Sequence, residues 1–187
     1  MSRFLTLLCL LLVSMTALAE RDVAGVRFAD RTSVGNAPLL LNGAGLRTRF
    51  MFKVYAAGLY LPARSAEPEA VIAMPGAKRL EIHALRDLKA SQLTEALQDG
   101  LAANHSEQEL ARLQPRVNQL FALFTDAEKG AELVLEYWPE DGTRVIANGE
   151  LGGVIEGADF FSALLRIWLG EKPAQGRLKE ALLGLSE

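Results

Sequence analysis

The fold is decided by one stretch of sequence, RFMFKVYAAGLYL, at residues 49–61. Its side chains alternate with the two-residue period of a β-strand. One set comprises Phe50, Phe52 and Val54, and the other comprises Arg49, Met51, Lys53 and Tyr55. Arg47, just upstream, shares the parity of the second set. We therefore predict a single long strand here, with a bulge or bend at Gly58.

The flanking residues continue the strand pattern in both directions. Upstream, residues 39–41 form a short apolar run that stops at Asn42-Gly43, a pair typical of turns. Downstream, residues 68–74 suggest a short helix, and residues 80–84 alternate again as in a strand. Residues 20–85 are therefore expected to consist mainly of strands.

The middle of the chain changes to a helical period. An apolar residue recurs at every fourth position, which predicts a helix over about residues 89–103. These apolar residues are Leu93, Leu97 and Leu101. Ser106 and Glu109 form a capping-box pattern, which opens a second helix. Pro115 lies inside that second segment, where it should kink or restart the helix.

Strand patterns return after residue 130. Residues 132–138 alternate, Asp141-Gly142 indicates a hairpin turn, and Asn148-Gly149 indicates another. An amphipathic helix follows over residues 160–169. Strands, helices, a second group of strands and final helices are the order typical of an α+β domain. We expect an antiparallel sheet with helices layered on one face.

The first 19 residues have the layout of a cleaved export signal. Arg3 precedes an apolar run over residues 4–13, and Ala17 and Ala19 form the small-residue pattern that signal peptidase reads. The alternative is a membrane anchor, but a spanning helix needs about 20 apolar residues. We predict cleavage before Glu20, one domain over residues 20–187, no stable membrane anchor, and a periplasmic or secreted protein.

Composition narrows the classes of partner. The net charge is −3, and lysine and arginine form no cluster, so no nucleic-acid partner is expected. The single cysteine, Cys9, lies within the predicted signal, so the exported chain has no disulfide. The composition leaves the oligomeric state open.

Familiar catalytic and metal-binding patterns are absent from the sequence. The two histidines, His83 and His105, are far apart and lack metal-ligand spacing, so surface roles are expected for both. Glu132 and Glu136 share a strand face, which we interpret as solvated. No metal and no cofactor are therefore expected.

The residues that remain as candidates lie around the opening stretch. They are Arg47, Arg49, Lys53 and Tyr55. On one strand face beside a cleft, they would form a polar, anion-binding end next to an apolar lining. Arginine binds a carboxylate in bidentate fashion, and tyrosine donates a further hydrogen bond. The alternative is that they form the solvent-exposed face of a half-buried strand, without a role in binding.

Several motifs together resemble the chalcone isomerase-like family, in its bacterial secreted branch. They are residues 43–47 (GAGLR), 56–61 (AAGLYL), 141–142 (DG), 155–160 (IEGADF) and 167–170 (IWLG). They occur in the family's order along nearly all of residues 20–187. The resemblance implies an open-faced β-sandwich, in which a long antiparallel sheet carries a layer of helices and a ligand cleft lies between the two.

The resemblance also bears on activity. Plant chalcone isomerases close a flavanone ring by intramolecular Michael addition, with an arginine on the substrate oxyanion and a threonine and a tyrosine polarising the ketone. Arg47 matches the arginine, whereas Tyr55 stands at the threonine and the tyrosine position falls near Leu93. Loss of the polarising groups removes the main electrostatic contribution to such a reaction. No catalytic residue is therefore expected.

Three functions stay open on the sequence. The first is non-catalytic binding of a small amphipathic molecule, such as a fatty acid, because plant relatives without activity resemble fatty-acid binders built around an arginine and a tyrosine. The second is an isomerase or lyase acting on an enone, with Arg47 and Tyr55 as its catalytic residues. The third is a structural or interaction module of the cell envelope.

Overall fold

The computed structural model describes residues 20–186, so the predicted export signal and Cys9 lie outside the described residues. The strands are β1 (Glu20–Val23), β2 (Val26–Ala29), β3 (Arg31–Val34), β4 (Ala37–Arg49), β5 (Phe52–Leu61), β6 (Lys78–Ala84), β7 (Glu132–Trp138), β8 (Gly142–Ala147) and β9 (Glu150–Ile155). The helices are α1 (Pro68–Ala73), α2 (Ala90–Asn104), α3 (Glu107–Ala122), α4 (Ala158–Leu169) and α5 (Gly176–Leu182). None of these helices is long and apolar enough to cross a membrane.

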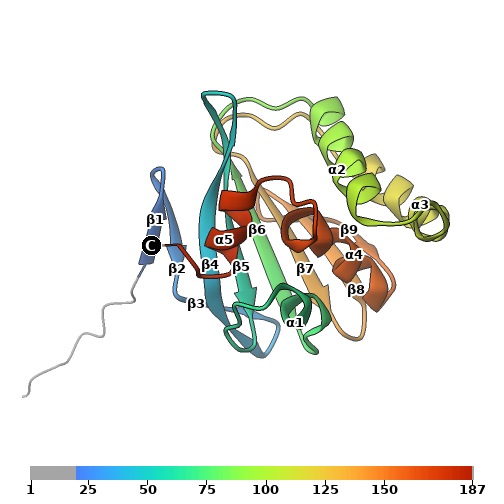
Figure 1. The fold of residues 1–187 in the computed structure, drawn as a ribbon, viewed down its shortest axis with the longest axis horizontal. Coiled ribbons are helices and arrows are strands. Elements are labelled where there is room, and N and C mark those ends of the chain that lie inside the picture. The colour runs from blue at the N-terminus through green and yellow to red at the C-terminus, as the bar shows by residue number, and fades with distance from the viewer. Residues whose placement is uncertain (1–19, 187) are drawn as a thin grey trace, which may run out of the picture.

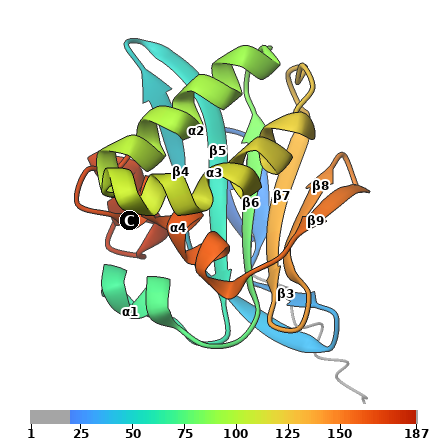
Figure 2. The ribbon, with the colours of Figure 1, turned by 90° about the vertical axis from the view of Figure 1, so that its right-hand side faces the viewer.

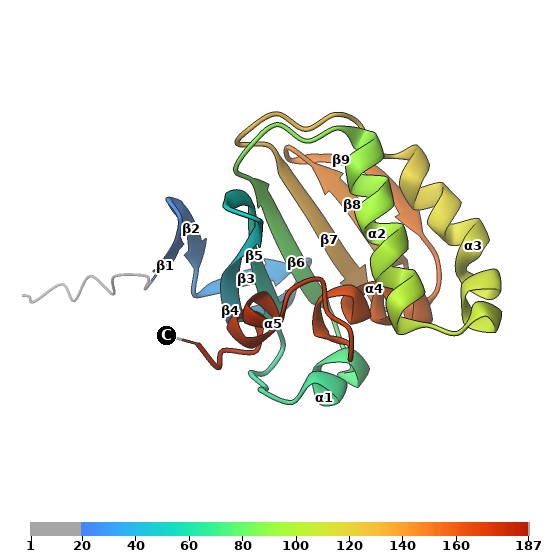
Figure 3. The same cartoon turned by 45° about the horizontal axis from the view of Figure 1, so that its top comes forward.

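Seven strands form one antiparallel sheet in the order β3-β4-β5-β6-β7-β8-β9, and β1 and β2 form a separate hairpin. Each strand of the large sheet lies beside its neighbour in the sequence. The helices gather on one face of this sheet (Figure 1), and they lie in front of its strands in the views of Figure 2 and Figure 3. This arrangement confirms the predicted α+β fold, with an antiparallel sheet and helices on one face.

Each face of the sheet carries its own hydrophobic core. The larger core joins sheet residues such as Leu59 and Leu80 to the apolar side of α4, including Phe160 and Leu164. The smaller core lies on the opposite, outer face, where Phe28 of β2 packs against Gly58 of β5. Because both faces are covered in part, the sheet also buries side chains that a one-sided sheet would leave in water.

The predicted single strand over residues 49–61 is wrong in one respect, because a hairpin turn interrupts it. β4 ends at Arg49 and β5 begins at Phe52, so Phe50 and Met51 form the turn. Phe50 has a φ of 56°, a value that turns usually assign to Gly, Asn or Asp. Because Phe50 and Met51 are apolar and continue the alternating pattern of the flanking residues, the sequence pattern gave no sign of the turn.

The predicted turn at Asn42-Gly43 is also wrong, since β4 runs through both residues with only an irregularity in its pairing. The Asn42 side chain donates to the carbonyls of Leu182 (2.8 Å) and Ser65 (3.0 Å) and accepts from the Ser65 amide (2.7 Å). A Cβ on Gly43 would overlap the carbonyl oxygen of Ala181 in α5. Both residues therefore serve close packing between strand and helix instead of a turn.

The helical predictions hold, with one exception. The Ser106 hydroxyl accepts from the Glu109 amide at 3.3 Å, and the Glu109 carboxylate accepts in return from the Ser106 amide at 2.8 Å, as in a capping box. Pro115 does not restart the helix, because α3 runs as one helix from Glu107 to Ala122. The alternative, a kink at Pro115, stays a prediction.

Candidate functional site

Arg47 and Tyr55 lie directly opposite each other, Arg47 on β4 and Tyr55 on β5. Opposite residues in an antiparallel pair point to the same face. Tyr55 packs against the larger core, so this is the face that carries the helices. The hydroxyl of Tyr55 accepts a hydrogen bond from Nε1 of Trp168 in α4 at 2.8 Å. The pair therefore sits at the junction of sheet and helices.

The two members of the pair differ in their electrostatic surroundings: the Tyr55 hydroxyl is buried, and the Arg47 guanidinium is charged. Burial raises the pKa of the Tyr55 hydroxyl, and the hydrogen bond from Trp168 and the charge of Arg47 oppose this rise without cancelling it. Arg47 is half-buried, and its guanidinium donates to the carbonyl of Thr48 at 3.1 Å. No carboxylate of residues 20–186 pairs with it. Tyr55 therefore stays neutral as a donor and acceptor, beside a cation that lacks an acidic partner.

The segment before α5 is held over this end of β4 by Gln175. Its side chain accepts from the Thr48 amide and donates to the Thr48 hydroxyl, both at 2.9 Å. Gln175 is the residue before α5, yet its side chain makes no cap bond to the helix because Thr48 occupies it. This double hydrogen bond positions α5 next to Arg47.

The other two candidate residues lie further out along the hairpin. In the register of β4 and β5, Arg49 lies opposite Phe52 and Lys53 lies opposite Thr48. Both cationic side chains are exposed. The turn at Phe50-Met51 thus divides the expected row of four residues between two strands. Only Arg47 and Tyr55 are neighbours on one face next to the helices. A role for Arg49 and Lys53 in ligand binding stays a prediction.

Two pockets of the structure lie away from the pair. One, of about 380 Å³, lies between β4, the loop after β5 and the C-terminal residues, and includes Arg21, Asn42 and Arg64. The other, of about 430 Å³, lies between α1, α3 and α4. Neither is lined by Arg47 or Tyr55.

The pocket between the helices contains residues that the sequence analysis did not single out. Two arginines there are held in bidentate pairs: Arg116 contacts Asp159 at 2.6 and 2.7 Å, and Arg166 contacts Glu69 at 2.9 and 2.8 Å. The carboxylates neutralise these arginines and join α3 to α4 and α1 to α4. No motif spacing marks them, because each pair connects segments far apart in the sequence.

A buried amine lies on the same side of the sheet at its other end. Lys78, only 3% exposed, has its Nζ 5.1 Å from the ring centre of Tyr137 and 5.9 Å from that of Phe161. Burial lowers the pKa of this amine. Attraction to the aromatic rings replaces the carboxylate that a buried lysine usually requires.

The outer face of the sheet holds a network of charges, and it corrects the expectation that Glu136 is solvated. Glu136 is buried, where it accepts from the Arg79 guanidinium and, at 3.0 Å, from Nε1 of Trp138. Arg79 also contacts Glu81 at 2.6 Å. Burial alone would raise the pKa of Glu81, but the close approach of His83 together with the charge and hydrogen bond of Arg79 outweigh it and lower this pKa.

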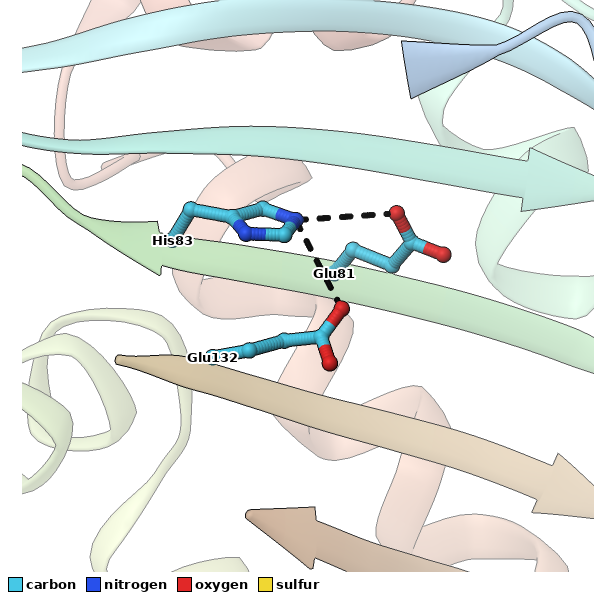
Figure 4. Close-up of side chains that lie close together, drawn as sticks. All are labelled: Glu81, His83 and Glu132. Carbon is cyan, nitrogen blue, oxygen red and sulfur yellow. Dashed lines mark ion pairs between the residues drawn. The ribbon is translucent and has the colours of Figure 1, made fainter. Parts of the chain in front are cut away.

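His83 extends this network, contrary to its expected surface role. Its Nε2 lies 3.8 Å from Glu81 and 3.7 Å from Glu132, and it is buried without a hydrogen-bond partner among the described residues (Figure 4). One ligand atom from each of the three residues falls within 4.8 Å of the others. The imidazole lies between the two carboxylates, and the same set offers three ligands to a divalent cation. Cross-strand pairing of His83 with Glu132 creates the cluster, so spacing along the chain could not reveal it.

Comparisons with known proteins agree with this fold. The sequence profile of a family described as chalcone isomerase-like matches residues 20–184. A fatty-acid binding protein of Arabidopsis thaliana has a similar solved structure, with a TM-score of 0.68 and 16% sequence identity, over 85% of this chain and 92% of that one. None of the curated proteins matches the sequence.

Proposed function

The chain belongs to the chalcone isomerase-like family, and from this premise we propose that it binds a small amphipathic carboxylate of the fatty-acid type without transforming it. Arg47 would bind the carboxylate and Tyr55 would share the polar end of the site. The exposed cations Arg49 and Lys53 would add an attractive field for an anion at the mouth of the site.

One observation carries this proposal, namely the half-buried guanidinium of Arg47 without a carboxylate partner in residues 20–186, beside the buried hydroxyl of Tyr55. Partly buried cations are normally paired, because desolvation is costly. A ligand carboxylate would supply the missing charge through bidentate hydrogen bonds. The apolar residues of the larger core beside Tyr55 suit an alkyl chain.

Two further points favour binding over catalysis. The structural neighbour from Arabidopsis thaliana is a fatty-acid binding protein, which supports a ligand of the same class here. In this chain the position of the family's catalytic tyrosine falls near Leu93, and leucine cannot polarise a ketone. The hydroxyl of Tyr55 is already engaged as acceptor by Trp168.

The two pockets described above do not reach Arg47 or Tyr55, so access to the pair needs a route of its own. We propose that an alkyl chain enters between α5 and the strands β4 and β5 by displacing side chains of that layer. The contact between α5 and β4 is held at its ends by Gln175 and Asn42, so small shifts of α5 between these two points would admit the chain.

The place where the protein works is part of the same proposal. We propose that residues 1–19 direct export, that cleavage precedes Glu20, and that the protein belongs to the bacterial secreted branch of the family. The apolar run and the Ala17-Leu18-Ala19 pattern support this assignment. Cell fractionation with determination of the N-terminal residue tests it, and a cytoplasmic protein that retains Met1 would contradict it.

Ligand binding is tested with residues 20–187 by native mass spectrometry and calorimetry against saturated fatty acids of several lengths. Arg47→Gln should weaken binding about 10- to 100-fold, since a hydrogen bond to a charged group contributes about 1.5–3 kcal/mol. Arg31→Gln is the matched control, because Arg31 is exposed on β3 away from the pair. Equal affinity of the Arg47 variant and the wild type, or turnover of a chalcone above background, would overturn the proposal.

A further inference from the structure

The turn between β4 and β5 presents three consecutive apolar side chains to solvent. Phe50 is 89% exposed, Met51 93% and Phe52 63%. The other large apolar residues that are exposed within residues 20–186 are Leu151, Val154 and Leu185, none of which forms such a run. The hairpin projects beyond the rest of the sheet in two perpendicular views (Figures 1 and 2). We call Phe50, Met51 and Phe52 the apolar tip.

Basic side chains surround the apolar tip. Arg49 and Lys53 flank it on the two strands, and the guanidinium of Arg86 lies 5.6 Å from the ring centre of Phe52. No acidic residue occurs between Asp30 and Glu67, although the chain as a whole carries a net charge of −3. The nearest acid in the neighbouring loop, Asp87, accepts a hydrogen bond from the Lys129 amide. The hairpin is thus a basic element on an acidic protein.

Three apolar side chains ringed by cations match the chemistry of a lipid surface. Aromatic and other apolar side chains insert into the boundary between headgroups and acyl chains, while arginine and lysine contact anionic headgroups. Three side chains of about 150–250 Å² each offer less than the roughly 800 Å² that a partner in a stable protein interface buries. The tip also projects as a narrow hairpin, whereas docking of a protein needs a broad complementary surface.

We propose that the apolar tip and its collar of Arg49, Lys53 and Arg86 dock the protein reversibly on membranes that contain anionic lipids. Docking would place the base of the hairpin, where Arg47 and Tyr55 face each other, next to the lipid surface. An amphipathic ligand could then pass between membrane and protein. Docking itself does not depend on the proposed ligand, because it uses side chains outside the Arg47–Tyr55 pair.

The test is flotation of residues 20–187 with vesicles of phosphatidylcholine alone and with vesicles that also contain phosphatidylserine. We expect binding to the mixed vesicles, weaker binding at high salt, and at least about tenfold weaker binding to phosphatidylcholine alone. Replacement of Phe50, Met51 and Phe52 together by serine should weaken binding to the mixed vesicles at least about tenfold, because binding follows the buried apolar area.

Matched variants distinguish binding through the apolar tip from non-specific binding of the protein to vesicles. The variant Leu151→Ser with Leu185→Ser removes two exposed apolar residues elsewhere and should bind as the wild type does. Arg49→Gln with Lys53→Gln should weaken binding to the mixed vesicles, whereas Arg31→Gln with Arg112→Gln, both exposed elsewhere, should not. Because the substituted side chains are exposed, all variants should keep the unfolding temperature of the wild type.

Three results would overturn the proposal. They are no flotation of the wild type, equal flotation of the tip variant, and a dimer in sedimentation that the tip variant loses, which would make the tip a contact between copies of the chain. Fatty-acid affinity is measured in parallel on the same variants. Failure of the proposed function would appear as no fatty-acid binding by the wild type or as equal affinity of the wild type and the Arg47 variant. Failure of docking would appear as unaltered flotation of the tip variant.

Discussion

The indole N–H of Trp168 donates to the hydroxyl of Tyr55 at 2.8 Å, joining helix α4 to strand β5 across 113 residues of sequence. Trp168 is buried, and Arg47 lies beside the same hydroxyl. The contact fixes the orientation of the Tyr55 ring between the sheet and the helices. It therefore links the stability of the fold to the geometry of the proposed binding pair.

Tyr55→Phe should lower the free energy of unfolding by about 1–3 kcal/mol, because it leaves the buried N–H of Trp168 without an acceptor. Urea unfolding measures the loss. Trp168→Phe should remove the same interaction, so the double variant should lose less than the sum of the single losses. Fully additive losses would show that the hydrogen bond contributes nothing to stability.

Arg79→Met should destabilise the protein by about 3–5 kcal/mol, because it leaves two buried carboxylates, Glu81 and Glu136, without their cation. Thermal and urea unfolding give the loss. The control is Lys89→Met, which breaks a pair with Asp126 on the exposed surface and should leave the free energy of unfolding nearly unchanged. Equal effects of the two substitutions would contradict the inferred role of the outer-face network.

Acid should weaken the fold through Glu81. The pKa of Glu81 is lower in the folded protein than its ordinary value of 4.5, so below that pH the unfolded chain binds more protons. The stabilisation is fully present above pH 4.5 and is lost as the pH falls through the folded pKa. Urea unfolding at a series of pH values should therefore show a shallower acid loss for Glu81→Gln than for the wild type.

The matched control for this series is Glu95→Gln, since Glu95 is exposed and has no ion pair among the described residues. It should keep the wild-type dependence on pH. If the Glu81 variant and the wild type lost stability in parallel between pH 5 and the acid limit, Glu81 would not be the responsible carboxylate.

Gly43→Ala should displace α5 from β4 and cost about 1–3 kcal/mol, because the added methyl group overlaps the carbonyl of Ala181. Gly176→Ala is the control, since a Cβ there meets no atom within 4 Å and alanine favours the helix. It should leave stability unchanged or raise it. Equal unfolding midpoints for the two variants would show that α5 adjusts freely, which would also ease entry of a ligand.

Much of the fold could be predicted because its signals are local. The fourfold leucine spacing marks α2, the capping box of Ser106 and Glu109 marks the start of α3, and the order of elements gives an antiparallel sheet with helices on one face. Asn148-Gly149 takes positive φ at both residues, as a tight hairpin requires. Each of these features depends on a few neighbouring residues, so the chain displays it without tertiary information.

The candidate site could be predicted only in part. Arg47 and Tyr55 were expected on one face because they share parity along a single strand, but they meet as partners across a hairpin. The outer-face cluster of Glu81, His83 and Glu132 was missed, since two of its members come from one strand and the third from another. Alternation shows which side chains share a face of a strand, and it carries no information about the register between strands.

The sequence by itself determined the helices, most of the strands, the α+β order and the residues able to bind an anion, because periodicity, caps and side-chain chemistry are properties of short segments. The tertiary structure alone decided that the stretch RFMFKVYAAGLYL folds back at Phe50-Met51 and that Asn42-Gly43 stays extended against α5. It also decided which charges become buried together. The reason is physical, because strand register, close approach of helix and sheet, and desolvation depend on contacts between distant segments.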